Sequence, residues 1–383
     1  MTRFARIVAL LVGALAMMVA SQARAGLVGL QDDQVPNFSG DALDRRLDLV
    51  DATRTKLTRV DVLWSEVAPT RPADPTNPAD PAYRWDRYDQ IFRGLAARGI
   101  TPIVDYYRTP PWATRSGRVN AAPPALDAGR FAGALARRYS GTFRDGAGRP
   151  LPRIRRFEIW NEPNIDQFWS PQCRRGRNGA YVPVAARRYA ALAYVAAREI
   201  RAAQPGAIVI GGVAGPAGGT NDGTRARPKR CATGGESVSA MTMVRYLRAE
   251  GVRLDAWSQH LYPIGSPAAA YFFPSWRALP TLFSALDKLR PGLPVYVTET
   301  GYHTSYNRFH RYFVSEAQQA DWLAQTFAVA DRYPRVEATI WFNLQDNVHW
   351  TGGLYHGDMT PKPALQRFIA LAADHPLPPD WRP

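Results

Sequence analysis

Two glutamates, Glu162 and Glu299, each stand where a run of β-branched and aromatic residues stops. Glu162 lies in "FEIWNEPN", where Pro163 cannot donate a strand hydrogen bond and so ends the pairing directly after the glutamate. Glu299 lies in "PVYVTETGY", where Gly301 lets the chain turn away. A neutral carboxyl can protonate a leaving oxygen while an ionised one attacks carbon. These two glutamates are therefore the candidate catalytic groups.

The elements that must hold these glutamates alternate along the chain. Eight short apolar or β-branched runs predict strands, and amphipathic stretches with helical spacing lie between and after them. Eight strand-then-helix units predict an α/β fold of the (β/α)₈ TIM-barrel type, with a doubly wound open sheet as the alternative. The predicted strands cover residues 27–30, 57–63, 101–106, 154–160, 207–213, 254–260, 294–298 and 336–342.

The chain reads as a single barrel domain over residues 26–383, because neither an internal repeat nor a second domain is evident in the sequence. Long loops are expected after the second, fourth and fifth strands. "PTRPADPTNPADPAY" follows the second strand and "GPAGGTNDGTRARPKRCATGG" follows the fifth, and both are rich in Pro or Gly and too polar for a core.

In such a barrel, active sites form where the strands end and the loops to the helices begin. Glu162 closes the fourth predicted strand and Glu299 the seventh, so the two carboxylates should face each other across the barrel mouth. Retaining glycoside cleavage needs such a pair about 5 to 5.5 Å apart, and inversion needs about 6.5 to 9.5 Å. The sequence leaves that distance open. Glu158 has the strand parity of Glu162 but lies two steps deeper, which predicts a buried partner for a barrel-lining Arg or Trp.

The two motifs together resemble a known group of enzymes. "WNEPN" after the fourth strand and "TETGY" after the seventh are similar to the glycoside hydrolases of clan A, and "FEIWNEPNIDQFW" most resembles family 39 and related cellulase-like enzymes. Weaker similarities in "RVDVLWSEV", "YYRTPPWA", "SQHLYP" and "TIWFNLQD" extend the resemblance over nearly the whole chain after residue 25. The long insertions after the fourth and fifth strands depart from the compact members.

The resemblance implies a retaining enzyme that cleaves β-linked poly- or oligosaccharides by double displacement. Glu162 would be the general acid and then the base, and Glu299 the nucleophile. Asn161 resembles the clan asparagine that holds the sugar 2-hydroxyl, although an asparagine there could also cap a turn. A transglycosylase with the same covalent intermediate and a glycan-binding barrel without catalysis are the alternatives.

Further site residues follow from the same resemblance. His260 and Tyr262 match the sixth-strand pair, in which the tyrosine orients the nucleophile, and Trp341 matches the tryptophan that floors the −1 sugar. A core histidine and plain barrel packing are the structural alternatives for His260 and Trp341. Arg59 could orient Glu299, or it could be a buried arginine paired with Asp61, Asp105 or Glu158.

Tryptophans gather in the loops after the strands, where flat faces could stack on pyranose rings. Each of them is individually more typical of packing, but together they favour a cleft for several sugar units. Trp112 is included among the expected substrate-binding residues, and the others are Trp64, Trp169 and Trp350.

No metal or other cofactor is expected. The six histidines show neither H-x-H nor HExxH spacing, which argues against a metal-dependent barrel hydrolase. The net charge of +15 comes with only four lysines among 48 basic residues, and the arginines are scattered along the chain. No helix-turn-helix, zinc-finger spacing or aromatic-basic strand accompanies them, so no nucleic-acid binding is expected.

The N-terminus resembles a bacterial export signal. Arg3 and Arg6 precede an apolar run over residues 7–20, and Ala23-Arg24-Ala25 is a small-x-small cleavage site, which predicts a signal peptide over residues 1–25 and a secreted or periplasmic protein. An uncleaved anchor is the alternative, but the apolar run is shorter than the roughly 20 residues that a spanning helix needs. We therefore expect no stable membrane insertion after cleavage.

The two cysteines, Cys173 and Cys231, are expected to form a disulfide, because an exported protein permits one and the loops after adjacent strands four and five meet at one rim. Two reduced, buried thiols are the alternative. The basic segments "CRRGR" and "RARPKRC" flank them, and such a rim could attract an anionic glycan. An arginine-rich surface with no role in substrate binding explains the same residues.

Overall fold

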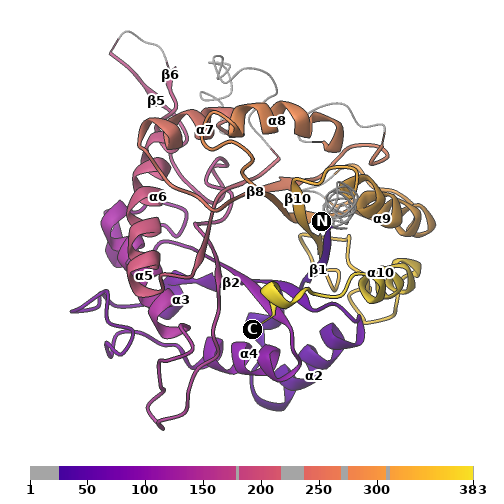
Figure 1. Cartoon of the computed structure of the whole chain (residues 1–383), viewed down its shortest axis with the longest axis horizontal. Helices are drawn as coiled ribbons and strands as arrows, with labels where there is room; N and C mark the ends of the chain where they lie inside the picture. Colours follow the sequence, from indigo (N-terminus) through magenta and orange to yellow (C-terminus); the bar gives the residue numbers. More distant parts are fainter. Residues whose placement is uncertain (1–25, 178–180, 217–236, 269–274, 308–310, 383) are drawn as a thin grey trace, which may run out of the picture.

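The computed structural model describes residues 26–177, 181–216, 237–268, 275–307 and 311–382. These residues form a closed barrel of parallel strands in the order β1-β10-β9-β8-β7-β4-β3-β2, with helices around it (Figure 1). The predicted TIM barrel is therefore confirmed. The barrel strands are β1 (Leu27–Gln31), β2 (Leu57–Leu63), β3 (Thr101–Tyr107), β4 (Arg156–Glu158), β7 (Ile208–Ala214), β8 (Ala256–Leu261), β9 (Val295–Thr300) and β10 (Val336–Phe342).

Helices follow the strands and form the outer layer. The α-helices are α2 (Gly40–Ala52), α3 (Trp64–Val67), α4 (Asp86–Ala97), α5 (Ala125–Arg138), α6 (Val184–Ala203), α7 (Ala240–Ala249), α8 (Leu279–Leu286), α9 (Glu316–Ala330) and α10 (Pro363–Asp374). Short 3₁₀ turns are η1 (Val35–Asn37), η2 (Pro111–Ala113), η3 (Trp276–Ala278) and η4 (Pro379–Trp381). Among the described residues, no helix combines the length and the apolar character that crossing a membrane requires.

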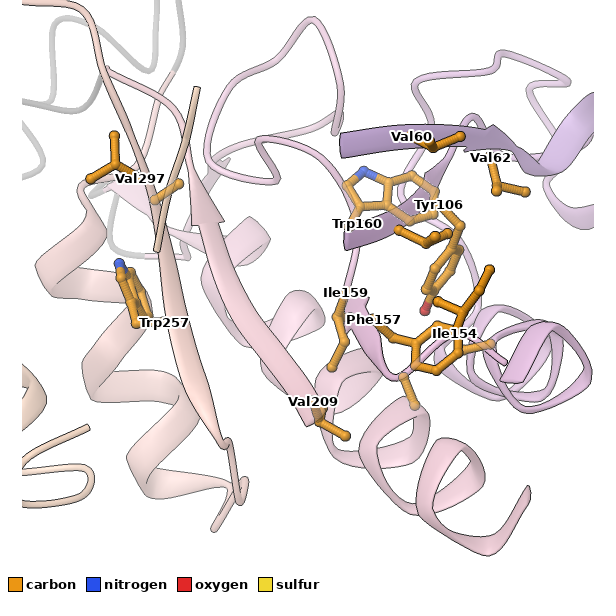
Figure 2. Close-up of a cluster of buried hydrophobic side chains, with 14 of the residues drawn as sticks. Val60, Val62, Tyr106, Ile154, Phe157, Ile159, Trp160, Val209, Trp257 and Val297 are labelled. Atoms are coloured by element: carbon orange, nitrogen blue, oxygen red, sulfur yellow. The ribbon is translucent and has the colours of Figure 1, made fainter. Parts of the chain in front are cut away.

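The main hydrophobic core lies between the barrel and the helices. Alternate strand residues point outward into this layer, as Val60 and Val62 of β2 do in Figure 2, while their neighbours point into the barrel. Helix packing is close enough to require glycine, since a Cβ on Gly129 of α5 would lie 2.4 Å from Val195 Cγ1 of α6. Burial of this apolar surface is the main force that closes the barrel.

A second core cluster fills the barrel at the N-terminal ends of the strands. It contains inward-facing residues such as Leu27, Leu57 and Ile103, and it also contains Trp381 from the turn η4. The Trp381 carbonyl accepts a hydrogen bond from Thr101 Oγ1 at 2.9 Å, and the Arg156 guanidinium lies 3.4 Å from the centre of the indole ring. The C-terminal turn therefore seals the barrel end opposite the mouth, where Figure 1 shows it in yellow across the strands.

Strand four is shorter than predicted. The sequence favoured a strand over 154–160, but β4 covers only Arg156–Glu158, and Trp160 and Glu162 have φ values of 72° and 40°. Glu158 and Glu162 were expected to lie on one strand and to point to the same side of it. That expectation is wrong, because β4 ends at Glu158.

The expected long loops after the second, fourth and fifth strands are present at 68–85, 159–183 and 215–239. The loop at 159–183 contains the antiparallel strands β5 (Arg174–Arg175) and β6 (Tyr181–Val182). Only the ends of the loop at 215–239 are described. Four further long loops, which the sequence pattern did not indicate, follow β3 at 108–124, β8 at 262–275, β9 at 301–315 and β10 at 343–362, and residues 269–274 and 308–310 of these loops lie outside the described part of the chain.

Replacing Trp381 should destabilise the barrel without touching its mouth. Trp381→Ala removes a buried indole and leaves the buried Arg156 guanidinium without its aromatic partner, so we expect the free energy of unfolding to fall by about 3 kcal/mol. Urea unfolding measures the change, and Trp381→Phe should recover part of it. A stability equal to that of the wild type would show that the turn does not close the barrel.

Candidate active site

One arginine organises the floor of the barrel mouth. Arg59 points inward from β2, its side chain is fully buried, and its nitrogens donate to six acceptors on five strands or their ends. Nε donates to Glu158, and Nη2 donates to Asp105 and Asn161. Nη1 donates to Gln31, Asp61 and Glu299. The distances are 2.7 Å to Glu158 Oε2, 2.9 Å to Asp105 Oδ2, 2.9 Å to Asn161 Oδ1, 3.2 Å to Gln31 Oε1, 3.3 Å to Asp61 Oδ1 and 2.7 Å to Glu299 Oε1.

The two interpretations of Arg59 that the sequence left open therefore hold together. Arg59 contacts Glu299 and also pairs with Asp61, Asp105 and Glu158. Because its side chain is fully buried, Arg59 acts on a substrate through Glu299 rather than by contact. The carboxylates outnumber the guanidinium, and burial raises the pKa of Asp105 well above its usual range despite the attraction of Arg59.

Glu162 lies at the mouth in an environment that favours its neutral form. Its side chain is almost completely buried, and its backbone N–H donates to the Val213 carbonyl at 3.0 Å. Burial raises the pKa of Glu162 to about 7, with only partial compensation from the charge of Arg59. A carboxyl that keeps its proton near neutral pH can serve as a general acid.

Glu299 lies opposite and is held by more partners. Arg59 Nη1 donates to Oε1 at 2.7 Å, and the Tyr262 hydroxyl donates to Oε2 at 2.6 Å. Burial raises the pKa of Glu299, while the charge of Arg59 and the Tyr262 hydrogen bond oppose that rise. Two hydrogen bonds to the carboxylate and an adjacent cation favour the ionised form, as a nucleophile requires.

His260 connects the two glutamates. Its Nδ1 lies 2.8 Å from Glu162 Oε1 and 3.4 Å from Glu299 Oε2, and one oxygen of each glutamate and a histidine nitrogen all lie within 4.8 Å of one another. Burial lowers the pKa of His260, so the ring is neutral at neutral pH. The side chain is fully buried and touches both carboxylates. It therefore positions the pair.

The same three residues are the one group in the described part of the chain that could present ligands to a metal. Their oxygens and Nδ1 already hydrogen-bond to one another, to Tyr262 and to Arg59. A divalent ion would have to share Glu299 with the Arg59 guanidinium, and repulsion between the two cations disfavours that arrangement. We therefore treat the site as a carboxylate pair, and the absence of a required metal stays a prediction.

Asn161 lies beside the pair. Its Oδ1 accepts from Arg59 Nη2, which orients the amide so that its NH₂ group is the end that can donate to a ligand. The positive φ values at Trp160 and Glu162 turn the chain at this point, so the asparagine and the glutamate follow each other at the rim.

The expected role of Trp341 needs correction. Trp341 is fully buried and belongs to the core between barrel and helices, because the inward-facing residues of β10 are Ala338 and Ile340. Phe342 has the parity of those two and is only partly buried, so it is the β10 aromatic residue that reaches the mouth. Its ring centre lies 5.1 Å from that of Trp350.

The other tryptophans divide between the core and the mouth. Trp64 and Trp169 are buried in the core, so they offer no platform to a sugar. Trp112 is partly buried, donates to the Ala68 carbonyl at 2.7 Å and stacks under the Arg71 guanidinium. Trp350 lies by the pair, with its ring 4.9 Å from that of Tyr262. Trp64 and Trp169 therefore match the packing role that is more typical of a single tryptophan, and Trp350 is the tryptophan of this group beside the pair. The cleft for several sugar units stays a prediction.

The backbone beside Glu162 is held by residues that the sequence analysis did not single out. The Asn164 side chain accepts from Gly215 N at 2.8 Å and donates to Gly215 O at 3.1 Å. Gly215 lies so close to the glutamate that an added Cβ would be 2.6 Å from Glu162 Cδ. The "GPAGG" that follows strand five was the available signal, but it reads equally well as an ordinary loop.

The expected disulfide falls partly outside the described residues. Cys173 is buried in the loop after β4, but Cys231 lies in the range 217–236 that the structure does not describe. The pairing stays a prediction.

Comparison with known proteins identifies the architecture. No family model and no curated protein matches the sequence. Solved structures do, among them a family 39 glycoside hydrolase from Bacteroides cellulosilyticus (19% identity, TM-score 0.57, covering 93% of this chain and 65% of that one). A glucosidase from Croceicoccus marinus (15%, 0.64, 92% and 67%) and a monomeric β-xylosidase from Caulobacter crescentus (18%, 0.59, 91% and 68%) are similar to the same degree.

This chain thus spans about two thirds of the length of each of these proteins. The resemblance to family 39 and its relatives is confirmed at the level of the fold.

A methyl group at position 215 should disturb the Glu162 carboxyl selectively. In Gly215→Ala the new Cβ would also lie 2.4 Å from Ile165 Cδ1, so the glutamate must shift, and we expect kcat/KM to fall about a hundredfold in any reaction that Glu162 catalyses. Gly146→Ala is the matched control, because its Cβ would meet nothing within 4 Å. An unchanged kcat/KM in Gly215→Ala would mean that the carboxyl does not depend on this contact.

Proposed function

We propose that this chain is a retaining glycoside hydrolase that acts on β-linked oligo- or polysaccharides. The observation that carries the proposal is the buried pair of Glu162 and Glu299 at the ends of β4 and β9, with oxygens within 4.8 Å of each other. That separation suits the retaining geometry of about 5 to 5.5 Å, since inversion needs room for a water between the carboxylates.

In the first step, Glu162 donates its proton to the glycosidic oxygen and Glu299 attacks the anomeric carbon. The bond to the leaving group breaks, and an ester forms between Glu299 and the sugar. In the second step, the Glu162 carboxylate takes a proton from water, and the resulting oxygen nucleophile displaces Glu299 from the sugar. Two inversions give net retention, and Glu162 and Glu299 return to their starting protonation states.

The surrounding residues have distinct tasks in this mechanism. Arg59 and Tyr262 hold the two oxygens of Glu299 and favour its ionised form. Asn161 presents its amide to the sugar 2-hydroxyl, a contact that strengthens in the transition state. A neutral His260 spaces the two carboxylates without adding a charge.

The nature of the sugar is part of the proposal. The similar structures include a glucosidase and a β-xylosidase, so β-glucosides and β-xylosides are the first substrates to test. Asp33 and Asp61 lie on the β1–β2 side of the mouth, and the Asp33 carboxylate is held by Asn343 at 2.5 Å and Asn347 at 2.9 Å. Carboxylates there suit the hydroxyls of a neutral sugar and disfavour a uronate in that position.

Export completes the proposal. Residues 1–25 lie outside the described residues, so the signal peptide and the secreted or periplasmic location rest on the sequence pattern. A polymeric substrate outside the cell is consistent with that location.

The two glutamates should separate kinetically. Glu299→Ala should abolish turnover because no other group can form the ester. Glu162→Ala should lower kcat/KM by about 10²- to 10⁴-fold for poor leaving groups, spare 2,4-dinitrophenyl glycosides in the first step, and be rescued by azide. NMR of the first product from a β-glycoside shows its anomeric configuration, and an initial α product would refute the mechanism.

The pH profile should reveal the raised pKa of Glu162. Because burial raises that pKa to about 7, kcat/KM should fall above pH about 7 as Glu162 loses the proton that it must donate. The acid limb reports Glu299, and both apparent values belong to the coupled pair. Substrates with 2,4-dinitrophenol as leaving group need no proton, so their alkaline limb should flatten, and an unchanged limb would point to a different titrating group.

Salt dependence tests whether the basic rim selects an anionic glycan. Arg174 and Arg175 are exposed in β5, and the second basic segment, 225–230, lies outside the described residues. If this rim captures an anionic chain, kcat/KM for a charged polysaccharide should fall more steeply with ionic strength than for a neutral one. Equal dependence of kcat/KM on ionic strength for the two polysaccharides would mean that these arginines do not take part in substrate binding.

A further inference from the structure

A cavity of about 650 Å³ opens between the loop after β8 and the loops after β9 and β10. One wall is Tyr262, whose hydroxyl holds Glu299, and Trp350 lies behind it. On another side Pro216 directly follows Gly215, the residue that packs against the Glu162 carboxyl. The cavity is therefore lined by a residue that holds Glu299 and by the chain neighbour of a residue that packs against Glu162.

Large apolar side chains in the outer part of this cavity are exposed to solvent. Tyr194, Tyr306, Tyr312 and Phe313 are the large exposed aromatic residues among those described, and three of them fall within residues 306–313. Tyr312 and Phe313 line the cavity and are 68% and 54% exposed, and Ile264 faces them from the loop after β8 at 62%. Grouped apolar exposure of this kind is typical of a surface that a ligand covers.

The position of the cavity fixes which part of a substrate would reach it. Glu162 must protonate the oxygen of the leaving group, so the leaving group lies on the Glu162 side of the cleaved bond. Pro216 places the cavity on that side, next to Gly215. On the other side, toward β1 and β2, stand the carboxylates Asp33 and Asp61, which suit the hydroxyls of the sugar that becomes bound to Glu299.

We propose that this cavity is a subsite for the leaving group, and that its occupant is a second pyranose ring whose C–H face stacks on Tyr312 and Phe313. The inference rests on the proposed function and deepens it by naming the residues that bind the second sugar unit. Arg311 and Gln318 lie in the same lining and provide donors for hydroxyl groups, which a plain aryl ring would leave unused.

Paired substrates test the subsite. Tyr312→Ala, Phe313→Ala and the double variant are compared with wild type on β-glycosyl fluorides, 4-nitrophenyl β-glycosides and β-1,4-linked disaccharides of xylose, glucose and mannose. A fluoride is too small to reach the cavity. We expect kcat/KM for the disaccharide to fall about tenfold in each single variant, and for the fluoride to stay unchanged. Tyr194→Ala, an exposed aromatic on α6, is the control that should alter neither.

Other outcomes overturn the subsite. An equal fall for fluoride and disaccharide would mean that the aromatic loop acts on the catalytic pair instead. No change for either substrate would mean that the cavity contacts no leaving group. If kcat/KM for the 4-nitrophenyl glycoside falls as much as that for the disaccharide, the occupant of the cavity is an aryl group and not a second sugar.

Direct binding separates failure of the subsite from failure of the proposed function. Xylobiose, cellobiose and β-1,4-mannobiose are titrated into wild type, and the fluorescence of Trp322 and Trp350, which line the cavity, is followed. If wild type cleaves no glycoside but binds a disaccharide, and Tyr312→Ala and Phe313→Ala lose that binding while Tyr194→Ala keeps it, the proposed function fails and the sugar subsite stands. If wild type neither cleaves nor binds these sugars, both are refuted.

Discussion

The buried guanidinium of Arg59 is the interaction on which the barrel mouth depends. It donates to side chains from β1, β2, β3, β9 and the β4 region, so one planar cation ties five elements into a fixed arrangement. Burying a charge is costly unless it is paired and hydrogen-bonded, and here nearly every N–H has an acceptor. The buried carboxylates lose their hydrogen bonds to water, and hydrogen bonds from Arg59 replace them. The geometry of Glu299 is therefore a property of the whole barrel floor.

The difference between the two glutamates follows from their distance to this cation. Glu299 contacts Arg59 and Tyr262 directly, whereas Glu162 has His260 as its hydrogen-bond partner and receives from Arg59 only a longer-range attraction. Burial raises the pKa of both carboxyl groups, but only Glu299 receives hydrogen bonds from Arg59 and Tyr262 that favour its ionised form. The chain turn with positive φ at Glu162 makes this possible, since it carries the glutamate past the end of β4 toward His260 on β8.

The sequence was most informative where a residue type leaves few choices. Gly301 correctly marks the end of the strand that carries Glu299, and strand–helix alternation predicts the barrel, whereas Pro163 lies in the turn beyond β4 that positions Glu162. Prediction failed where tertiary packing decides. Trp341 and Phe342 are adjacent aromatic residues, and only the parity of β10 within the closed barrel determines which one faces the mouth. The loop after β9 has one glycine and no proline, so nothing in its composition marks it as a loop. The loop after β10 does contain Gly352, Gly353 and Pro361, but that composition does not reveal that Trp350 lines the cavity beside Glu299.

The sharing of Arg59 among six acceptors also constrains how this protein can evolve. Substitutions of residues in one hydrogen-bond network are not additive, so a change at Asp61, Asp105 or Glu158 alters the effect of every later change at the others. Such epistasis makes stepwise exchange of the floor residues difficult. The described residues of the loop over 301–315 do not hydrogen-bond to Arg59, so selection for new specificities should accumulate its accepted mutations in that loop.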